Sequence, residues 1–268
     1  MSAALELRAW LQAVGLLGPG LHDWPAAAQV LAGGAYTPQP TVIPPLECLP
    51  GAERRRTGTV VRLALAAGLE AVSRAAADAT RLPTVFASSG GDGLNCHEIC
   101  VTLASAERQI SPTRFHNSVH NAAAGYWGIA TGATAAANAL CGHDASFGAG
   151  LLEALTQVQV EATAVLLIAY DASYPEPMRS VRPIPHAFAV ALLLTPVAQP
   201  RALARLTVAV SGGPPTRMDD LRLEALRESI PAARSLPLLR AVALGAPGRI
   251  VIDYLEEQRL SIEVGTCP

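Results

Sequence analysis

Two long apolar runs limit the folds that this chain can adopt. They read TAVLLIAYDA (163–172) and HAFAVALLLTP (186–196). Each has the length of a strand and is too short to cross a bilayer, which takes about 20 apolar residues in a helix. The first run is apolar almost throughout, which is typical of a strand buried on both faces of a sheet. We therefore expect a sheet covered by helices, and no membrane span.

Strand and helix patterns alternate along the rest of the chain. Further strands are predicted near the N-terminus and over 84–87, 134–140 and 204–212. A long helix is predicted over 53–79, because apolar residues recur there at helical spacing. This alternation predicts an α/β fold. A break after Gly213 separates residues 1–213 from a shorter part, residues 214–268, in which we expect two short helices and a strand pair.

Composition excludes several kinds of chemistry. The chain has 268 residues and a formal net charge of −2, and all 20 of its basic residues are arginine. Without lysine, no Schiff-base lysine, P-loop lysine or Ser–Lys dyad can form. The small net charge gives no reason to expect nucleic acid or an anionic membrane as a partner. The five cysteines form no disulfide framework and the N-terminus lacks a signal-peptide pattern, so we expect a cytoplasmic location.

Three consecutive arginines, Arg54, Arg55 and Arg56, stand at the expected start of the helix over 53–79. The start of a helix carries a partial positive charge, so cations do not stabilise it there. The cluster could therefore hold an acidic partner or a phosphate. The alternative is a solvated run of charges.

Two cysteines, Cys96 and Cys100, lie one turn apart on a helix predicted over 94–108. They could share a metal ion, but no second ligand pair follows at zinc-site spacing. We expect a buried structural pair and no bound metal. The stretch SSGGDG (88–93) lacks both the GxGxxG pattern and a P-loop lysine, so we expect a tight turn there and no cofactor.

The segment FHNSVHN brings four polar residues together at helical spacing: His116, Asn117, His120 and Asn121. His116 and His120 could face one pocket, as a general base and its partner or as metal ligands. Alternatively, these side chains cap a helix and form local hydrogen bonds. We expect the cluster to line a pocket or an interface.

The stretch ANALCGHDASFGAG (137–150) predicts a strand, a sharp turn and a helix. Cys141 falls at the end of the strand. The helix is expected to begin near Ala145 or Ser146, with Asp144 as its N-cap. A nucleophilic thiol needs a base and an oxyanion hole, or a helix dipole that lowers its pKa. The dipole would act nearer to residues 143–145 than to Cys141.

Together these stretches resemble the N-terminal half of β-ketoacyl synthases, condensing enzymes of the thiolase fold. The resemblance covers roughly residues 5–212, is strongest over 110–195, and rests on AVGLLGPGLHDWPAAAQVLAGG, ISPTRFHNSVHNAAAGYWGIATG and ALCGHDASFGAGLLEALTQV. FHNSVHNAAAGYW and ASFGAGLLEAL are similar to a ketosynthase-like branch found with aryl polyene and xanthomonadin-type pathways. The resemblance implies a thiolase-like half, with a mostly parallel or mixed central sheet flanked by helices, and a short C-terminal appendage.

In such systems a catalytic ketosynthase pairs with a ketosynthase-like subunit, the chain-length factor, which lacks the active cysteine. Matching the family's apolar residue after the nucleophile to Phe147 puts His143 at the nucleophile position, with Asp144 and Ser146 beside it in a vestigial elbow. The histidines and lysine of the family's C-terminal half have no counterpart in residues 214–268. The resemblance also implies an open apolar face that a partner covers, with contacts at 121–131 and 134–140.

Three functions are compatible with these patterns. The first is a non-catalytic chain-length factor that forms a heterodimer with a catalytic ketosynthase and meets an acyl carrier protein and the growing acyl or polyene chain. Arg54–Arg56 would then be a basic patch that binds a partner. The second is an active β-ketoacyl synthase or acyltransferase, with Cys141 as nucleophile and His116, His120 or His143 as base. The third is a homodimeric acyl-binding scaffold.

Overall fold

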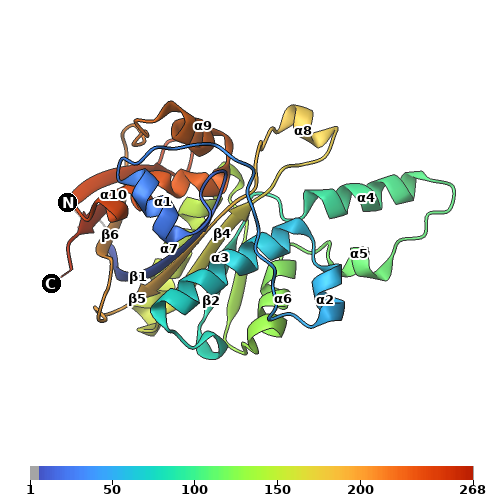
Figure 1. The fold of residues 1–268 in the computed structure, drawn as a ribbon, viewed down its shortest axis with the longest axis horizontal. Coiled ribbons are helices and arrows are strands. Elements are labelled where there is room, and N and C mark those ends of the chain that lie inside the picture. Colours follow the sequence, from blue (N-terminus) through green and yellow to red (C-terminus); the bar gives the residue numbers. More distant parts are fainter. Residues whose placement is uncertain (1–5, 268) are drawn as a thin grey trace.

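A mixed sheet of eight strands runs through the computed structural model, which describes residues 6–267 (Figure 1). In the order of their pairing, the strands are β3 (Ala137–Leu140), β2 (Thr84–Ala87), β4 (Val165–Asp171), β5 (Phe188–Thr195), β1 (Leu7–Leu17), β6 (Ala204–Ser211), β8 (Arg259–Gly265) and β7 (Gly248–Asp253). β2 pairs in parallel with β3 and β4, and the other pairs are antiparallel. The prediction of an α/β fold with a mixed sheet is confirmed.

Ten α-helices connect and cover these strands within the described residues. They are α1 (Trp24–Leu31), α2 (Gly51–Arg56), α3 (Thr59–Ala75), α4 (Gly93–Ala104), α5 (Pro112–His116), α6 (Ala122–Thr131), α7 (Ser146–Glu161), α8 (Met178–Val181), α9 (Leu221–Ser229) and α10 (Leu236–Leu244). Three short 3₁₀ helices accompany them: η1 (Ala79–Arg81), η2 (His143–Ala145) and η3 (Pro231–Ser235). None of the helices in residues 6–267 has the length and apolar character needed to span a membrane.

Helices cover both faces of the central strands, as the apolar runs predict. Every residue of β4 and β5 is buried. α3 packs on one face with α6, whereas α7 packs on the other face together with α1, η3 and α10. The chain therefore covers both faces of these strands with its own helices, whereas an open apolar face on the outer side of a helix layer stays a prediction. The outer strands are less covered: β3, β6 and β7 each leave residues exposed.

Residues 214–268 add strands to the same sheet. β8 pairs with β6 along its whole length, and β7 forms the outer edge, so the predicted strand pair is confirmed. α9 and α10 lie where two short helices are expected. Leu236 and Ile262 belong to the same core cluster as Phe147 and Leu167. This part of the chain thus shares the hydrophobic core of the rest.

The helix expected over 53–79 is two helices. Thr57 adopts an extended conformation and Gly58 becomes the N-cap of α3, so the chain breaks between α2 and α3. The three arginines therefore occupy the last turn of α2 and not the start of a helix, which corrects the prediction. Cations at a helix C-terminus interact favourably with the helix dipole. The dipole consequently gives no argument that these arginines serve a partner.

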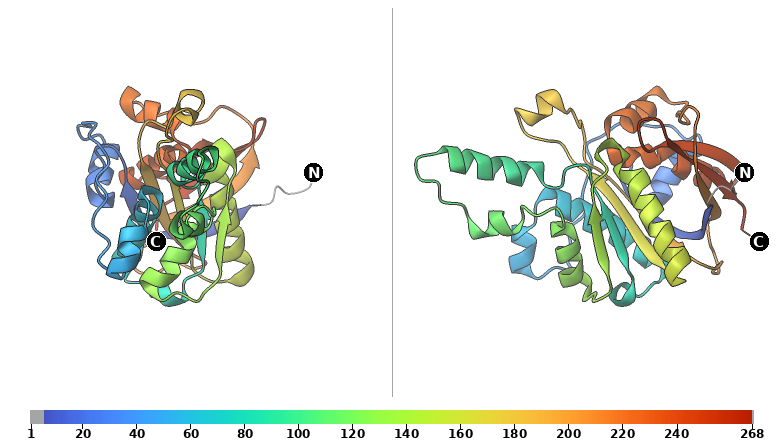
Figure 2. Two further views of the ribbon diagram at one scale, coloured as in Figure 1. Left: turned by 90° about the vertical axis from the view of Figure 1, so that its right-hand side faces the viewer. Right: turned by 180° about the vertical axis from the view of Figure 1, so that it is seen from behind.

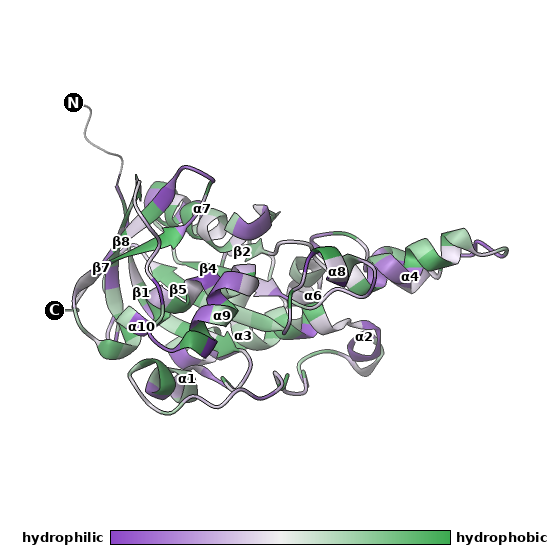
Figure 3. Ribbon diagram, turned by 90° about the horizontal axis from the view of Figure 1, so that it is seen from above, coloured by the Kyte–Doolittle hydropathy of each residue, from purple (hydrophilic) through white to green (hydrophobic). Residues whose placement is uncertain are grey.

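An arm projects from one end of the molecule (Figures 1 and 2). It consists of α4, α5 and the loop between them, and Asn95 is the only buried residue of the two helices. Hydrophobic and hydrophilic residues follow one another along α4 (Figure 3). Large apolar side chains are exposed on the arm and just after it: Leu94, Val101, Leu103, Phe115 and Val119. The arm has no hydrophobic core of its own.

Close contact between α3 and β1 depends on Gly15. A Cβ atom at this position would overlap the carbonyl oxygen of Ala67 in α3. Backbone cannot rotate away as a long side chain can, so either the helix or the strand would have to move. Gly15 therefore sets the distance between the sheet and its longest helix.

Replacing Gly15 with Ala should destabilise the protein by about 3 kcal/mol or more, because overpacking forces backbone shifts. Urea unfolding followed by circular dichroism measures this. Gly125→Ala is the matched control, since no atom lies within 4 Å of an added Cβ in α6. That change should stabilise the helix by about 0.5–1 kcal/mol. Equal effects of the two substitutions would contradict the role of Gly15.

Candidate functional site at the elbow after β3

The turn between β3 and α7 is a strained elbow. Cys141 and Gly142 follow the strand, and His143 adopts a left-handed conformation with φ of +53°. Non-glycine residues seldom adopt this conformation, and they concentrate at functional sites. In strand–turn–helix elbows that present a nucleophile, the nucleophile occupies the strained position of the turn. Here a histidine occupies it, two residues after the cysteine.

Cys141 is exposed, and its sulfur contacts two backbone groups. Its Sγ is 3.3 Å from the carbonyl oxygen of Ser89, which can only accept a hydrogen bond. The backbone N–H of His143 approaches the sulfur at 3.5 Å. The Nε2 atom of His120 lies 3.1 Å from the carbonyl oxygen of Ser88, so it donates there. Within residues 6–267, no histidine ring forms a hydrogen bond with the Cys141 thiol.

The His143 ring is tied to a cluster of charges. Arg182 Nη1 lies 2.8 Å from His143 Nε2, and Arg182 Nη2 donates to Asp144 Oδ1 at 2.7 Å. Arg234 Nη2 lies 3.3 Å from the other oxygen of Asp144. Because a guanidinium can only donate, Nε2 of His143 must act as an acceptor. That nitrogen is therefore unavailable to take a proton from a neighbouring group.

Asp144 does not cap α7, which corrects the prediction. The N-cap position belongs to Ala145, and no side chain caps the helix there. Asp144 instead pairs with two arginines that lie far away in the sequence. Partial burial would raise the pKa of Asp144, but the hydrogen bond and the charges of Arg182 and Arg234 outweigh burial and hold the pKa below its ordinary value.

Two further elbow residues have structural roles. The Ser146 hydroxyl donates to the carbonyl oxygen of His143 at 2.7 Å and accepts the N–H of Gly142 at 3.1 Å, so it closes the turn. Phe147 is fully buried in the core beneath α7. These contacts fix the turn and leave the His143 side chain 72% exposed.

A buried carboxylate lies beside the elbow. Asp171 Oδ1 accepts the N–H and the hydroxyl of Ser89 at 2.9 and 2.6 Å, and Oδ2 accepts the N–H of Ala232 at 2.8 Å. Burial raises the pKa of Asp171 to about 6, although these hydrogen bonds act in the opposite direction. Asp171 thereby joins the turn after β2 to η3.

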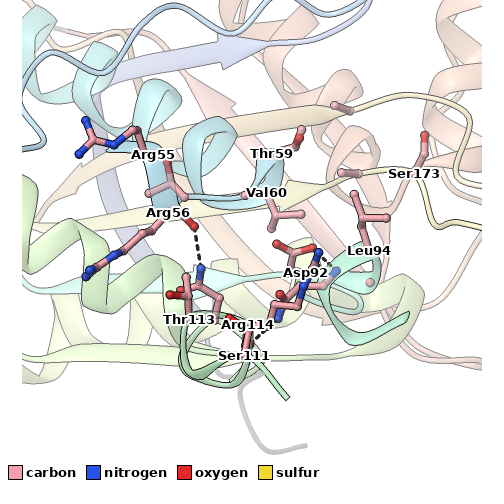
Figure 4. Close-up of a pocket in the computed structure, with 17 residues that line it drawn as sticks. Arg55, Arg56, Thr59, Val60, Asp92, Leu94, Ser111, Thr113, Arg114 and Ser173 are labelled. Atoms are coloured by element: carbon pink, nitrogen blue, oxygen red, sulfur yellow. Dashed lines mark hydrogen bonds between the residues drawn. The ribbon is translucent and has the colours of Figure 1, made fainter. Parts of the chain in front are cut away.

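A cavity of about 620 Å³ lies where the arm joins the body (Figure 4). It is lined from the starts of α3, α4 and α5 and from the segment after β4. Arg55 and Arg56 lie on one side, and Asp92 and Leu94 lie on the other. Buried Asn117 fixes the wall: its Nδ2 donates to the carbonyl oxygen of Arg56 at 2.7 Å, and its Oδ1 accepts the Tyr126 hydroxyl at 3.1 Å.

The other residues of the FHNSVHN segment spread apart. His116 is exposed and its ring packs edge-on against Tyr126, whereas His120 turns toward the Ser88 carbonyl. Asn121 is exposed at the N-cap position of α6 and makes no capping side-chain hydrogen bond. Of the four, only Asn117 lines the large cavity.

The expectation of a buried cysteine pair is wrong, because Cys96 and Cys100 are both exposed on the arm. The reason is that α4 projects away from the core and leaves a single residue, Asn95, buried. Among the described residues, no three groups of the types that ligate metals lie close enough to hold an ion.

Sequence reasoning missed the residues that surround the elbow, Arg182, Arg234, Asp171 and Tyr174. All four lie at least 28 residues beyond His143 in the chain, so no local pattern connects them to it. The glycines of SSGGDG (88–93) were the one local sign that a bulky side chain packs over this turn. A Cβ at Gly90 or Gly93 would overlap the ring of Tyr174, which packs over this turn.

A family comparison agrees with this architecture. Residues 22–241 match the family described as "Beta-ketoacyl synthase, N-terminal domain". The chain belongs to this family, which confirms the resemblance seen in the sequence. No curated protein matches the chain.

Solved structures show the same fold. One is from a ketosynthase (ApeO) in complex with its chain length factor (ApeC) from Xenorhabdus doucetiae, with 24% identity, a TM-score of 0.72, and coverage of 96% of this chain and 99% of that chain. The ishigamide ketosynthase/chain length factor has 13% identity, a TM-score of 0.72 and coverage of 98% and 100%. A chain of AntDE:AntF, a type II PKS acyl-carrier protein in complex with its ketosynthase bound to the hexaketide, has 11% identity, a TM-score of 0.75 and coverage of 98% and 100%.

The raised pKa of Asp171 makes stability depend on pH. The folded protein holds this proton more tightly than the unfolded chain, so Asp171 favours folding below about pH 4 and loses this contribution as the pH rises through about 6. A shift of about two units corresponds to roughly 3 kcal/mol. Urea unfolding between pH 4 and 7 measures the slope.

Asp171→Asn should flatten that slope. It should also lower stability by roughly 1–3 kcal/mol, because the amide nitrogen would face a backbone N–H. Asp78→Asn is the matched control, since Asp78 is exposed and its pKa is lowered by the Thr80 hydroxyl. An unchanged slope in the Asp171 variant would contradict the assignment.

Proposed function

We propose that this chain is a non-catalytic ketosynthase-like subunit, a chain-length factor, that pairs with a catalytic β-ketoacyl-ACP synthase in polyene or fatty-acid-type chain elongation. One observation carries the proposal. The strained position of the elbow holds His143, and Arg182 occupies the ring nitrogen that could act as a base. The turn therefore keeps the shape of a nucleophile elbow without a nucleophile at its apex.

The chemistry of a condensing enzyme is not assembled around Cys141. An acyl-accepting thiol must be activated by a base or by a depressed pKa. The contacts of Cys141 are two backbone groups, and neither of them is a base. Exposure of Cys141 is the one feature that speaks for the alternative, an active enzyme, and the adduct experiment below distinguishes the two.

The surface for a ketosynthase partner would lie at the β3 edge. β3 pairs only with β2 among the described strands, and its residues are exposed or half-buried. An unpaired edge strand presents free backbone N–H and C=O groups to another chain. The neighbouring arm adds exposed apolar side chains, including Phe115 and Val119. Both features suit a heterodimer in which the partner covers β3, α6 and the arm.

The large cavity would receive the far end of the growing acyl or polyene chain. It lies at the base of the arm and has Val60, Leu94 and Ala187 among its lining residues. Its volume of about 620 Å³ is within the usual range for small-molecule sites. The walls would then limit the product length by sterics alone.

An acyl carrier protein is the proposed second partner, and Arg54–Arg56 form its docking patch. Arg56 pairs with Glu53 at 3.2 Å. Arg54 and Arg55 make no ion pair with any residue in 6–267, and both are exposed. Since the whole chain has a net charge of −2, this concentration of arginine suits an acidic protein surface.

Intact-protein mass spectrometry tests the central claim. After incubation with an acyl-carrier thioester, we expect no acyl adduct on this chain, alone or with a ketosynthase, and an adduct on the partner's cysteine. Cys141→Ala should leave elongation by the pair unchanged. A stoichiometric acyl adduct on the isolated chain that disappears in the Cys141 variant would establish the active enzyme instead. A stable homodimer that ignores ketosynthases would favour the scaffold.

Filling the cavity should shorten the product. Thr113 lines the cavity. Thr113→Trp should lower the yield of the longest product, relative to shorter products, by roughly tenfold or more, because a bulkier wall excludes the longer chain. Liquid chromatography with mass spectrometry of the reconstituted reaction measures the distribution. Thr156→Trp, at an exposed position of α7, is the control. An unchanged distribution in the Thr113 variant would show that the chain end goes elsewhere.

Removing charge from the docking patch should weaken carrier binding. For the pair with Arg54→Ala and Arg55→Ala, we expect affinity for the carrier protein to fall roughly three- to tenfold at low salt. The difference should shrink at high salt, because screening reduces attraction between exposed charges. The double variant Arg81→Ala and Arg217→Ala is the control, because it removes the same amount of charge outside the patch. Equal losses in both double variants would argue against a specific patch.

A further inference from the structure

Cys96 and Cys100 are the two cysteines of this chain that lie within one helical turn of each other. They stand four positions apart on α4, so their side chains share one face of the helix. Both are exposed on the projecting arm (Figure 1). Desolvation, Asp92 and Cys100 together raise the pKa of Cys96, so the two thiols lie close enough to influence each other. Neither the family assignment nor the proposed function gives this pair a role.

The rest of the chain gives α4 little support. Asn95 is the only buried residue among its 12. Besides the two cysteines, the helix contains His97, Ile99, Val101 and Thr102, which all have a lower helix propensity than Ala, Leu or Glu. An isolated helix of about 12 residues is only marginally stable in water, even when it is built from good helix formers. Unwinding part of α4 therefore costs little free energy.

A disulfide between the two cysteines is incompatible with the helix. Side chains four positions apart in an α-helix have their Cβ atoms about 5–6 Å apart. A disulfide needs Cβ atoms about 3.5–4.5 Å apart. The turn between residues 96 and 100 must therefore unwind before the bond can close, and almost no packing in α4 opposes this. The reduced pair fits the helix that the structure shows, and the oxidised pair does not.

We propose that Cys96 and Cys100 form a reversible redox switch that controls the arm, with hydrogen peroxide as the oxidant. The Cys100 thiolate attacks one peroxide oxygen, so that a sulfenic acid forms and the other oxygen leaves as water. The Cys96 thiol then attacks this sulfur, the S–S bond forms, and the sulfenic oxygen leaves as a second water. The two thiols lose two electrons, and the peroxide takes them up. A dithiol reductant restores both thiols by exchange.

The order of the two steps follows from the environment of Cys96. Thiolates react with peroxide and thiols do not, so the cysteine with a raised pKa is poorly suited to the first attack. Desolvation and the neighbouring Asp92 raise the pKa of Cys96 in this way. Cys96 is therefore the resolving cysteine of the pair.

Unwinding changes the surface that the arm presents. Leu94 and Val101 are both exposed and stand seven positions apart, so they lie on one face of the intact helix. The disulfide interrupts the helix between them and takes them out of line. Oxidation would then prevent the arm from pairing with a ketosynthase, a consequence that rests on the proposed function. The disulfide chemistry itself does not depend on that function.

Peroxide treatment of the full chain, followed by peptide mapping and hydrogen exchange with mass spectrometry, tests the switch. We expect a disulfide that links Cys96 to Cys100, and exchange of the α4 amides that is roughly tenfold faster than in the reduced chain. Dithiothreitol should reverse both changes. Persistence of the two thiols, or a disulfide that leaves α4 exchange unchanged, would overturn the proposal.

Two variants separate the disulfide from oxidation in general. Cys96→Ser should stop the reaction at the sulfenic acid of Cys100 and leave α4 exchange as it is in the reduced chain. Cys48→Ser, which removes an exposed thiol outside the arm, should respond as the unchanged chain does. If Cys96→Ser loses α4 protection as fully as the unchanged chain, the disulfide is not the cause.

Pairing with a ketosynthase tests the consequence. We expect the oxidised chain to bind roughly tenfold or more weakly than the reduced chain, because the apolar contacts of the arm are lost. The double variant Cys96→Ala and Cys100→Ala should bind equally well with and without peroxide. Equal binding of the oxidised and reduced chains would show that the disulfide does not control the arm. If the reduced chain binds no ketosynthase, the proposed function fails, and the exchange experiment still decides the switch.

Discussion

The buried carboxylate of Asp171 joins the turn after β2 to η3. Its two oxygens receive three donors, two from Ser89 after β2 and one from Ala232 in η3. Burying a carboxylate is unfavourable unless its oxygens are hydrogen-bonded. Asp171 therefore fixes the turn that contains Ser88 and Ser89. The Ser88 carbonyl contacts His120, and the Ser89 carbonyl contacts Cys141. Asp171 thereby holds the turn that the elbow contacts through Cys141.

Much of the fold follows from local patterns. The runs that become β4 and β5 are apolar enough to be buried whichever way they pair, and the strand pair of β7 and β8 is visible as two apolar stretches around a turn. The break at Thr57 and Gly58 is harder to predict, because the apolar periodicity that indicates the helix begins only at Val60, after the break. The projection of α4 is not encoded in its periodicity either, since its apolar residues are those of an ordinary core helix.

The candidate site is harder than the fold to predict from local sequence patterns. The strand, turn and helix around Cys141 can be predicted from the local sequence. The match of Phe147 to the family's apolar residue also places His143, two residues after Cys141, at the nucleophile position. The side chains that contact the turn cannot be predicted from local sequence, because Arg182 lies 39 residues from His143 in the chain. Asp144 has the residue type of an N-cap, but two distant arginines compete successfully for its side chain. Long-range ion pairs of this kind overrule local capping preferences.

Substitutions in the arm and in the body of the molecule are expected to differ in their effect on stability. Substitutions in the core of the body change the free energy of unfolding, because the two clusters of buried apolar side chains lie there. Those at the exposed apolar positions of α4 and α5 leave that free energy almost unchanged, since their side chains contact little of the chain. A screen for thermal stability would therefore score the arm as freely mutable. At these exposed apolar positions, selection acts through whatever the arm contacts outside its own chain.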